Sequence, residues 1–265
     1  MVDIIQRNLL RLIRCGVFDL PEEIEPMSEW KWQQLFQLAQ IHGVTPWVGD
    51  GLLKKKDDFF VNLSPALRQK FYDDDTERTE KGESPRLTHP RLNSRLQQIS
   101  REVHDNDATY AMLQDLIAIS SNILTHGVSL RQLIMLGLKL KSNSTTINYD
   151  LLKEWIDRLG MTTMAALEGA LLMELLHLAA ADIPFTEAKT SKKTADAVAD
   201  IFRLTQKNAT DWYFTQGESI FVRSSNSNAM LWYMRQAVKY MPYYPIEGIA
   251  SLIANFAHSL THIEE

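Results

Sequence analysis

The sequence contains a single cysteine, Cys15, among 265 residues. One thiol cannot form a disulfide within the chain, so the fold does not depend on one. This composition is consistent with a reducing compartment, and we therefore predict a cytoplasmic protein. Cys15 lies in an apolar helical pattern without a neighbouring histidine, which favours a packed thiol over a reactive one.

Long apolar runs are also absent. The longest candidates, residues 171–181 and 246–257, are interrupted by Glu or His and are shorter than the roughly 18–20 residues of a membrane-spanning helix. Near the N-terminus, Asp3, Arg7 and Arg11 recur at helical spacing without a small-residue cleavage site, unlike a signal peptide. The sequence thus predicts no membrane span.

An excess of positive charge is absent too. The formal net charge is −5 and the isoelectric point about 5.8, so we predict no binding to duplex nucleic acid. Hydrophobic residues make up 45% of the chain and charged residues 23%, which excludes a mostly disordered protein.

Apolar residues recur with the period of an α-helix throughout, whereas strand-like alternation is almost missing. The pattern predicts an all-α protein, an irregular multi-helix array or bundle with little or no β-sheet. We divide it into an N-terminal helical region (1–72), a charged loop (73–90) and a C-terminal helical domain (91–265), packed as one globular unit.

Several residues predict where helices begin and end. Ser28, Ser64-Pro65, Asp107, Ser129 and Asn148 are typical of helix starts. Gly16, Gly43 and Gly160 are typical of helix ends, because glycine adopts the left-handed conformation at little cost. The helices predicted in the second half of the chain include residues 148–160, 163–180, 188–207, 211–221, 230–240 and 246–262.

Two pairs of residues are candidate metal ligands. Glu174 and His177 are spaced i, i+3 like half of a di-iron motif, but a second such pair is missing from the sequence. His258 and His262 are spaced i, i+4 like two zinc ligands, without the glutamate of a protease helix. We interpret both pairs as ordinary helix residues and predict no metal or other cofactor.

Known nucleotide-binding and catalytic strings are missing, including the glycine-rich phosphate loops and the nucleophile motif G-x-S-x-G. No catalytic residue is predicted. Aromatic and basic residues near the C-terminus are candidates for stacking or holding a nucleotide, although their helical spacing also fits core packing. These candidates are Trp212, Arg223, Trp232, Arg235 and Tyr243.

Several segments carry a resemblance to a known family: LLRLIRCGVF, WQQLFQLAQIHGVTPWVGDGL, HGVSLRQLIMLGLKL, NYDLLKEWIDRLGM and RQAVKYMPYYPIEGI. They resemble the helical N- and C-terminal regions of bacterial nucleotidyltransferase-family proteins. In that family a small sheet between these regions carries a lysine-glycine turn and a D-x-D pair that holds the metal and the nucleotide. Here Asp105 and Asp107 have that spacing but lack flanking strands, so the resemblance implies a relative that lost its catalytic core.

The sequence leaves three hypotheses for the function. The first is a non-catalytic helical protein that binds a protein partner or its own copy as a homo-oligomer. The second is a nucleotidyltransferase-like enzyme or nucleotide-binding protein with a degenerate or re-sited pocket. The third is a helical metalloprotein that uses Glu174 and His177.

Overall fold

The structure is a computed structural model that describes residues 3–73, 85–103, 107–125, 127–142, 145–203 and 234–261, with side chains given up to residue 254. None of these residues is in a strand, which confirms the all-α prediction. Residues 192–203 and 234–240 are also helical. The labelled helices are α1 (Ile4–Phe18), α2 (Glu29–Ile41), α3 (Thr45–Lys54), α4 (Pro65–Tyr72), α5 (Pro90–Glu102), α6 (Ala108–Leu124), α7 (Leu130–Ser142), α8 (Tyr149–Arg158), α9 (Thr162–Leu176), η1 (Ala180–Asp182), η2 (Met241–Tyr243) and α12 (Pro245–Thr261).

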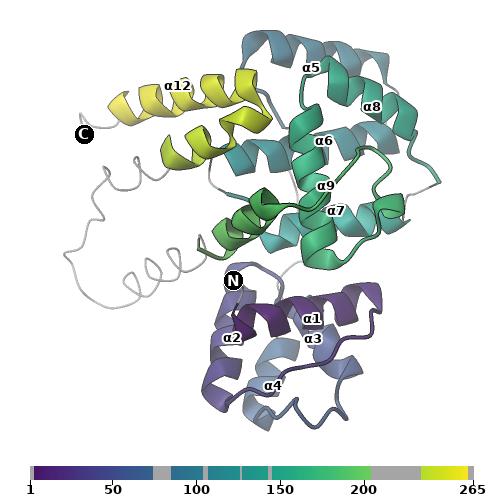
Figure 1. The fold of residues 1–265 in the computed structure, drawn as a ribbon, viewed down its shortest axis with the longest axis vertical. Coiled ribbons are helices and arrows are strands. Elements are labelled where there is room, and N and C mark those ends of the chain that lie inside the picture. The colour runs from purple at the N-terminus through teal and green to yellow at the C-terminus, as the bar shows by residue number, and fades with distance from the viewer. Residues whose placement is uncertain are drawn as a thin grey trace.

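The helices gather in two groups (Figure 1). Helices α1–α4 form the lower group, where α1 packs mainly on α3 and also on α2. The upper group is built around α6 and α9, which contact each other and share α7 and α8 as neighbours. In the described part of the chain, every helix is too short or too polar to cross a lipid bilayer.

Helix starts follow the predicted capping residues. The Asp107 carboxylate accepts a hydrogen bond from the Thr109 amide, and the Asn148 side chain accepts one from the Leu151 amide. Such bonds satisfy amides that a helix leaves without an internal partner. Ser28 precedes α2 as predicted, but its side chain makes no capping bond.

Glycine ends two helices as predicted and is misread at a third. Gly43 and Gly160 have φ of 63° and 68°, the left-handed conformation expected after a helix. The predicted end at Gly16 is wrong, because α1 continues to Phe18 and Asp19 takes the left-handed position with φ of 56°. Gly16 therefore has another role.

That role is the close crossing of α1 and α3. A Cβ atom on Gly16 would lie 2.3 Å from the Trp47 carbonyl oxygen, and one on Gly51 would lie 2.2 Å from the Leu12 carbonyl oxygen. Both distances are far below van der Waals contact. The two backbones therefore touch, and a side chain at either position would push the helices apart.

Two further helix boundaries differ from prediction. Helix α9 ends at Leu176 rather than residue 180, because His177 adopts the left-handed conformation with φ of 55°. The next long helix begins at residue 192 rather than 188, since Ser191 and Thr194 exchange backbone-to-side-chain hydrogen bonds that cap its start. The predicted helix 211–221 and residues 74–84 of the predicted charged loop lie outside the described residues.

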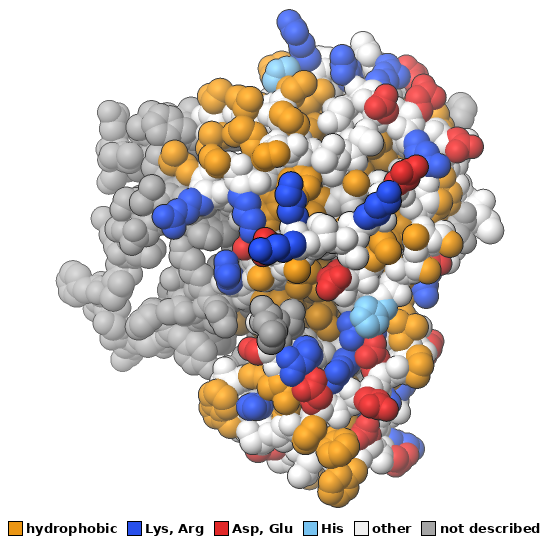
Figure 2. Space-filling view, viewed as in Figure 1, with side chains coloured by type: hydrophobic (Ala, Val, Ile, Leu, Met, Phe, Trp, Pro, Cys, Tyr) orange, Lys and Arg blue, Asp and Glu red, His pale blue; other side chains and the backbone are white. Residues whose placement is uncertain are grey.

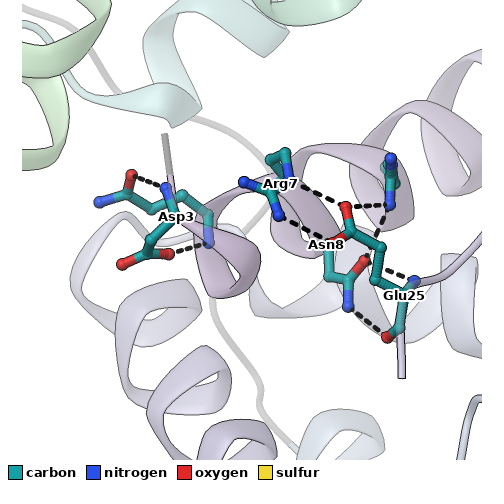
Figure 3. A network of polar contacts seen from close by, with 6 residues as sticks. Asp3, Arg7, Asn8 and Glu25 are labelled. Atoms are coloured by element: carbon teal, nitrogen blue, oxygen red, sulfur yellow. Dashed lines mark hydrogen bonds and ion pairs between the residues drawn. The ribbon is translucent and has the colours of Figure 1, made fainter. Parts of the chain in front are cut away.

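The lower group is reinforced by a polar network on α1 (Figure 3). The Glu25 carboxylate accepts hydrogen bonds from Arg7 at 2.8 Å and from Arg11 at 2.7 Å, and the Asn8 side chain bonds both the amide and the carbonyl of Glu25. The hydrogen bond from Arg7 is the main cause that lowers the Glu25 pKa to about 2. These bonds hold the segment that follows α1, and that contains Glu25, against this helix.

Arg14 joins the two groups. Its guanidinium donates to the Glu22 carboxylate at 2.5 Å and to the carbonyl oxygen of Leu175, in the last turn of α9, at 3.1 Å. The Arg14 side chain is only 7% exposed. A buried cation needs such partners, because leaving it unpaired costs several kcal/mol, of the order of 3–5.

His42 makes a second junction. Its Nδ1 atom accepts a hydrogen bond from the Leu130 amide at the start of α7, 3.4 Å away. The His42 ring also packs edge-on against the Phe202 ring, with 5.9 Å between the ring centroids. Arg131 adds a hydrogen bond to the Gly43 carbonyl oxygen at 3.1 Å. Burial lowers the His42 pKa to about 4, so the imidazole is neutral at pH 7.

A carboxyl group is buried in the core of the upper group. Glu168 on α9 is fully buried and accepts a hydrogen bond from the Ser120 hydroxyl of α6 at 2.7 Å. Its other oxygen, Oε2, has no hydrogen-bond partner among the described residues. Burial raises the Glu168 pKa well above its ordinary value, so the folded protein favours the protonated acid.

We expect His42 to set an acid limit on stability. The unfolded histidine binds its proton near pH 6.5 and the folded one only near pH 4, so protonation favours unfolding between these values. The loss over this window is about 3 kcal/mol. Urea unfolding from pH 7 to 4 should show a steeper decline for the wild type than for His42→Asn, which keeps an acceptor but does not titrate. Parallel declines would contradict the assignment.

Glu168 is expected to change stability with pH in the opposite direction to His42. Its folded pKa is raised, so the unfolded chain releases the proton near pH 4.5 while the folded chain retains it, and stability falls as pH rises above 4.5. The slope approaches about 1.4 kcal/mol per pH unit. Thermal unfolding from pH 5 to 8 should lose this slope in Glu168→Gln. The exposed neighbour on α9 provides the control, because Glu174→Gln should retain it.

Candidate ligand cleft

An open cleft of about 270 Å³ lies where three parts of the upper group meet. The start of α9, helix 192–203 and the segment from helix 234–240 into η2 form its walls. Its lining combines two amines, one carboxylate, one hydroxyl and two phenol rings. The lining residues are Thr163, Lys193, Asp196, Lys239, Tyr240, Pro242 and Tyr243.

Local structure explains why these side chains converge. Lys193 and Asp196 are three residues apart on one helix, so both point from the same face. The cap at Ser191 fixes where that helix starts and hence which face is presented. Pro242 and the short 3-10 turn η2 redirect the chain directly after Tyr240, which brings Tyr243 to the same opening.

Asp200 organises the polar side of the cleft. Its carboxylate forms an ion pair with Lys239 and accepts a hydrogen bond from the Tyr240 hydroxyl at 2.8 Å. Arg203 adds a third interaction at 3.7 Å. Burial, with a further contribution from the Asp200 charge, raises the Tyr240 pKa, so the hydroxyl remains a donor.

The two phenol rings form one wall. The Tyr240 and Tyr243 ring centroids lie 6.1 Å apart with an interplanar angle of 39°. The Lys239 amine lies over the Tyr240 ring, 5.3 Å from its centroid, and this cation–π contact stabilises the charged form of the lysine. Tyr240 is buried and Tyr243 half-buried, so Tyr243 offers the accessible ring.

The cleft contains one of the nucleotide-binding candidates from the sequence. Tyr243 lines it, whereas Arg235 lies on helix 234–240 outside the lining. The candidates Trp212, Arg223 and Trp232 lie outside the described residues. Sequence reasoning missed Thr163, Lys193 and Asp196, because they come from other helices and form no recognisable string.

Of the metal candidates, only Glu174 and His177 have described side chains. Glu174 is in the last turn of α9, while His177 follows the helix and lies 3.6 Å from the Glu22 carboxylate. Burial and the nearby Arg14 lower the His177 pKa. The side chains of His258 and His262 lie outside the described part. No group of three or more His, Cys, Asp or Glu in the described residues is placed to hold a metal ion.

A second surface feature lies next to the cleft. Five apolar side chains on α12 and helix 234–240 are between 37% and 64% exposed. Figure 2 shows hydrophobic side chains gathered over these two helices, with Lys and Arg side chains below them over helix 192–203. We call this surface the C-terminal apolar face; it consists of Met234, Val238, Ile246, Ile249 and Ile253.

Comparisons with known proteins find no relative. No protein-family model, no curated protein and no solved structure matches this chain. The resemblance to the helical regions of nucleotidyltransferase-family proteins therefore stays a prediction. Any function must be inferred from the geometry of the cleft and of the C-terminal apolar face.

We expect Asp200 to hold the cleft together. Asp200→Ala leaves the buried Tyr240 hydroxyl without its acceptor, which should cost about 1–3 kcal/mol of unfolding free energy. Tyr240→Phe removes the donor instead and should cost about 1 kcal/mol. Since both variants remove the same hydrogen bond, the double variant should lose less unfolding free energy than the sum of the two single variants. Urea denaturation measures all three.

The control for these three variants lies on the same helix as Asp200. Asp196 is exposed, so Asp196→Ala should change stability by no more than about 0.5 kcal/mol. Equal effects of Asp196→Ala and Asp200→Ala would contradict the role given to Asp200.

Proposed function

We propose that this chain is a non-catalytic helical protein that binds a protein partner through the C-terminal apolar face. The observation that carries the proposal is the spacing of Ile246, Ile249 and Ile253. They lie at i, i+3 and i+7 on α12 and remain about half exposed or more. Apolar residues at this spacing form one stripe along a helix, the pattern by which helices pack against each other.

The neighbouring helix widens the surface. Met234 and Val238 lie one turn apart on helix 234–240 and are also exposed. Soluble proteins seldom leave contiguous apolar patches uncovered unless the patch binds something. The partner that fits is another helical surface with its own apolar stripe, from a second copy of this chain or from a different protein.

The non-catalytic part of the proposal is supported by the middle of the chain. The described residues between Leu53 and Thr125 form α4, α5 and α6, without a strand. Asp107 caps α6, and Asp105 lies outside the described residues. This is consistent with a relative of nucleotidyltransferase-family proteins that kept the helical frame and lost the catalytic sheet. Cys15 is buried, and burial raises the pKa of its thiol, which favours a packed thiol over a reactive one.

The second candidate function is a nucleotidyltransferase-like enzyme or nucleotide-binding protein with a re-sited pocket. The position of Tyr243 in the cleft favours it, because an accessible phenol ring offers a stacking surface for a base. A nucleotide bound to the folded state raises the melting temperature. Thermal unfolding with each of the four nucleoside triphosphates and Mg²⁺ tests this candidate, and unchanged melting would contradict it.

The docking proposal predicts a position-specific partner. A photo-crosslinking amino acid at Ile249 should give one defined product in cells. The same amino acid at Phe59, which is 89% exposed in the connection between α3 and α4, should not. Mass spectrometry of the product distinguishes a second copy from another protein. Adding Ile253→Lys should abolish the product, because a charge in the apolar stripe opposes docking.

The same variant separates binding from folding. Ile253 is exposed, so Ile253→Lys should shift unfolding free energy by no more than about 0.5 kcal/mol. Identical product patterns from positions 249 and 59, or a product that persists in Ile253→Lys, would contradict the assignment of the face.

A further inference from the structure

The cleft has its own chemistry, independent of the apolar face. Lys193 has no carboxylate within ion-pair distance among the described residues, so its charge is available to a ligand. Lys239 is paired with Asp200, and Arg203 also lies within ion-pair distance of the same carboxylate. Two cations therefore share one anion, so positive charge is in excess around Asp200. The cations Lys193 and Lys239 come from different helices and lie on the walls of one opening.

The start of α9 adds hydrogen-bond donors to these charges. Its N-cap position is taken by Met161, which provides no side-chain cap. Amides in the first turn of a helix lack an internal acceptor and attract anions. Thr163, the second residue of α9, lines the cleft and carries both a hydroxyl and one of these first-turn amides. Amines, amides and a hydroxyl together are the groups that bind a phosphate.

The other lining residues indicate which kind of molecule bears the phosphate group. Asp196 accepts hydrogen bonds and makes none to another described side chain, so it is suited to hydroxyl groups of a ligand. Tyr243 offers an apolar ring face on the same opening. The volume of about 270 Å³ lies just below the range of about 300–1,000 Å³ typical of drug-sized ligands. The cleft therefore fits a small ligand.

We propose that the cleft binds a small phosphorylated polyol, of the size of a sugar phosphate. The phosphate lies between Lys193, Lys239 and the start of α9. The hydroxyl groups donate to Asp196, and the carbon skeleton packs on the Tyr243 ring. The two lysines and Asp196 divide the site into a part that binds phosphate and a part that recognises hydroxyl groups.

The test is isothermal titration calorimetry on the whole chain with glucose 6-phosphate, ribose 5-phosphate, glycerol 3-phosphate, inorganic phosphate, glucose and AMP. At least one of the three polyol phosphates should bind more tightly than inorganic phosphate, and glucose should not bind. Lys193→Gln should weaken that ligand at least about tenfold, since a hydrogen bond to a charged group is lost. The control Lys192→Gln removes the same charge one residue away, outside the lining, and should change affinity less than twofold.

A further variant separates the two parts of the site. Asp196→Asn should weaken the polyol phosphate several-fold and leave inorganic phosphate unchanged or tighter, because a negative charge near the anion is removed. The proposal is overturned by the absence of binding to all three polyol phosphates, or by binding of AMP alone. Equal losses in Lys192→Gln and Lys193→Gln would also overturn it, since they indicate attraction to the general surface charge.

Discussion

The direct contact between the backbones of α1 and α3 is the constraint on which the lower group depends. Gly16 and Gly51 leave no room for a side chain, because a Cβ on either would lie within 2.3 Å of a backbone oxygen of the opposite helix. Their absence of side chains sets the distance and the crossing of the two helices. Larger residues could not relax locally, since the obstructing atoms belong to the backbone.

The position of α1 in turn determines how the two groups meet. With α1 fixed against α3, Arg14 reaches across to the Leu175 carbonyl oxygen while Glu22 neutralises its charge. His42 makes a parallel junction at the end of α2, where a neutral imidazole accepts from the start of α7. These junctions are polar and directional, so they fix one orientation between the groups where apolar packing alone would allow several.

The sequence predicted the class of the fold and most helix starts, because both depend on local chemistry. Asp107 and Asn148 form bonds with amides two or three residues away, and Gly43 has a conformation that few other residues adopt. Gly16 was misread because a glycine required for packing looks the same in sequence as one required for a turn. His177 ends α9 in a left-handed conformation that its residue type does not predict.

The candidate site depends even more on the tertiary fold. Thr163, Lys193 and Tyr243 are unremarkable in sequence and become neighbours only when α9, helix 192–203 and η2 pack together. The exposed isoleucines of α12 follow the same periodicity as a core stripe, so only burial distinguishes the two. A sequence pattern identifies the apolar face of a helix, but the fold decides whether that face is covered.

The cleft and the C-terminal apolar face share helix 234–240. Val238 belongs to the face, while the adjacent Lys239 and Tyr240 belong to the cleft and are held by Asp200. A phosphate that bridges Lys193 and Lys239 would tie this helix to helix 192–203, and a partner docked on Val238 would restrain it from the other side. Once either the phosphate or the partner restrains helix 234–240, the other binds at a lower entropy cost. This coupling is reciprocal by thermodynamic necessity.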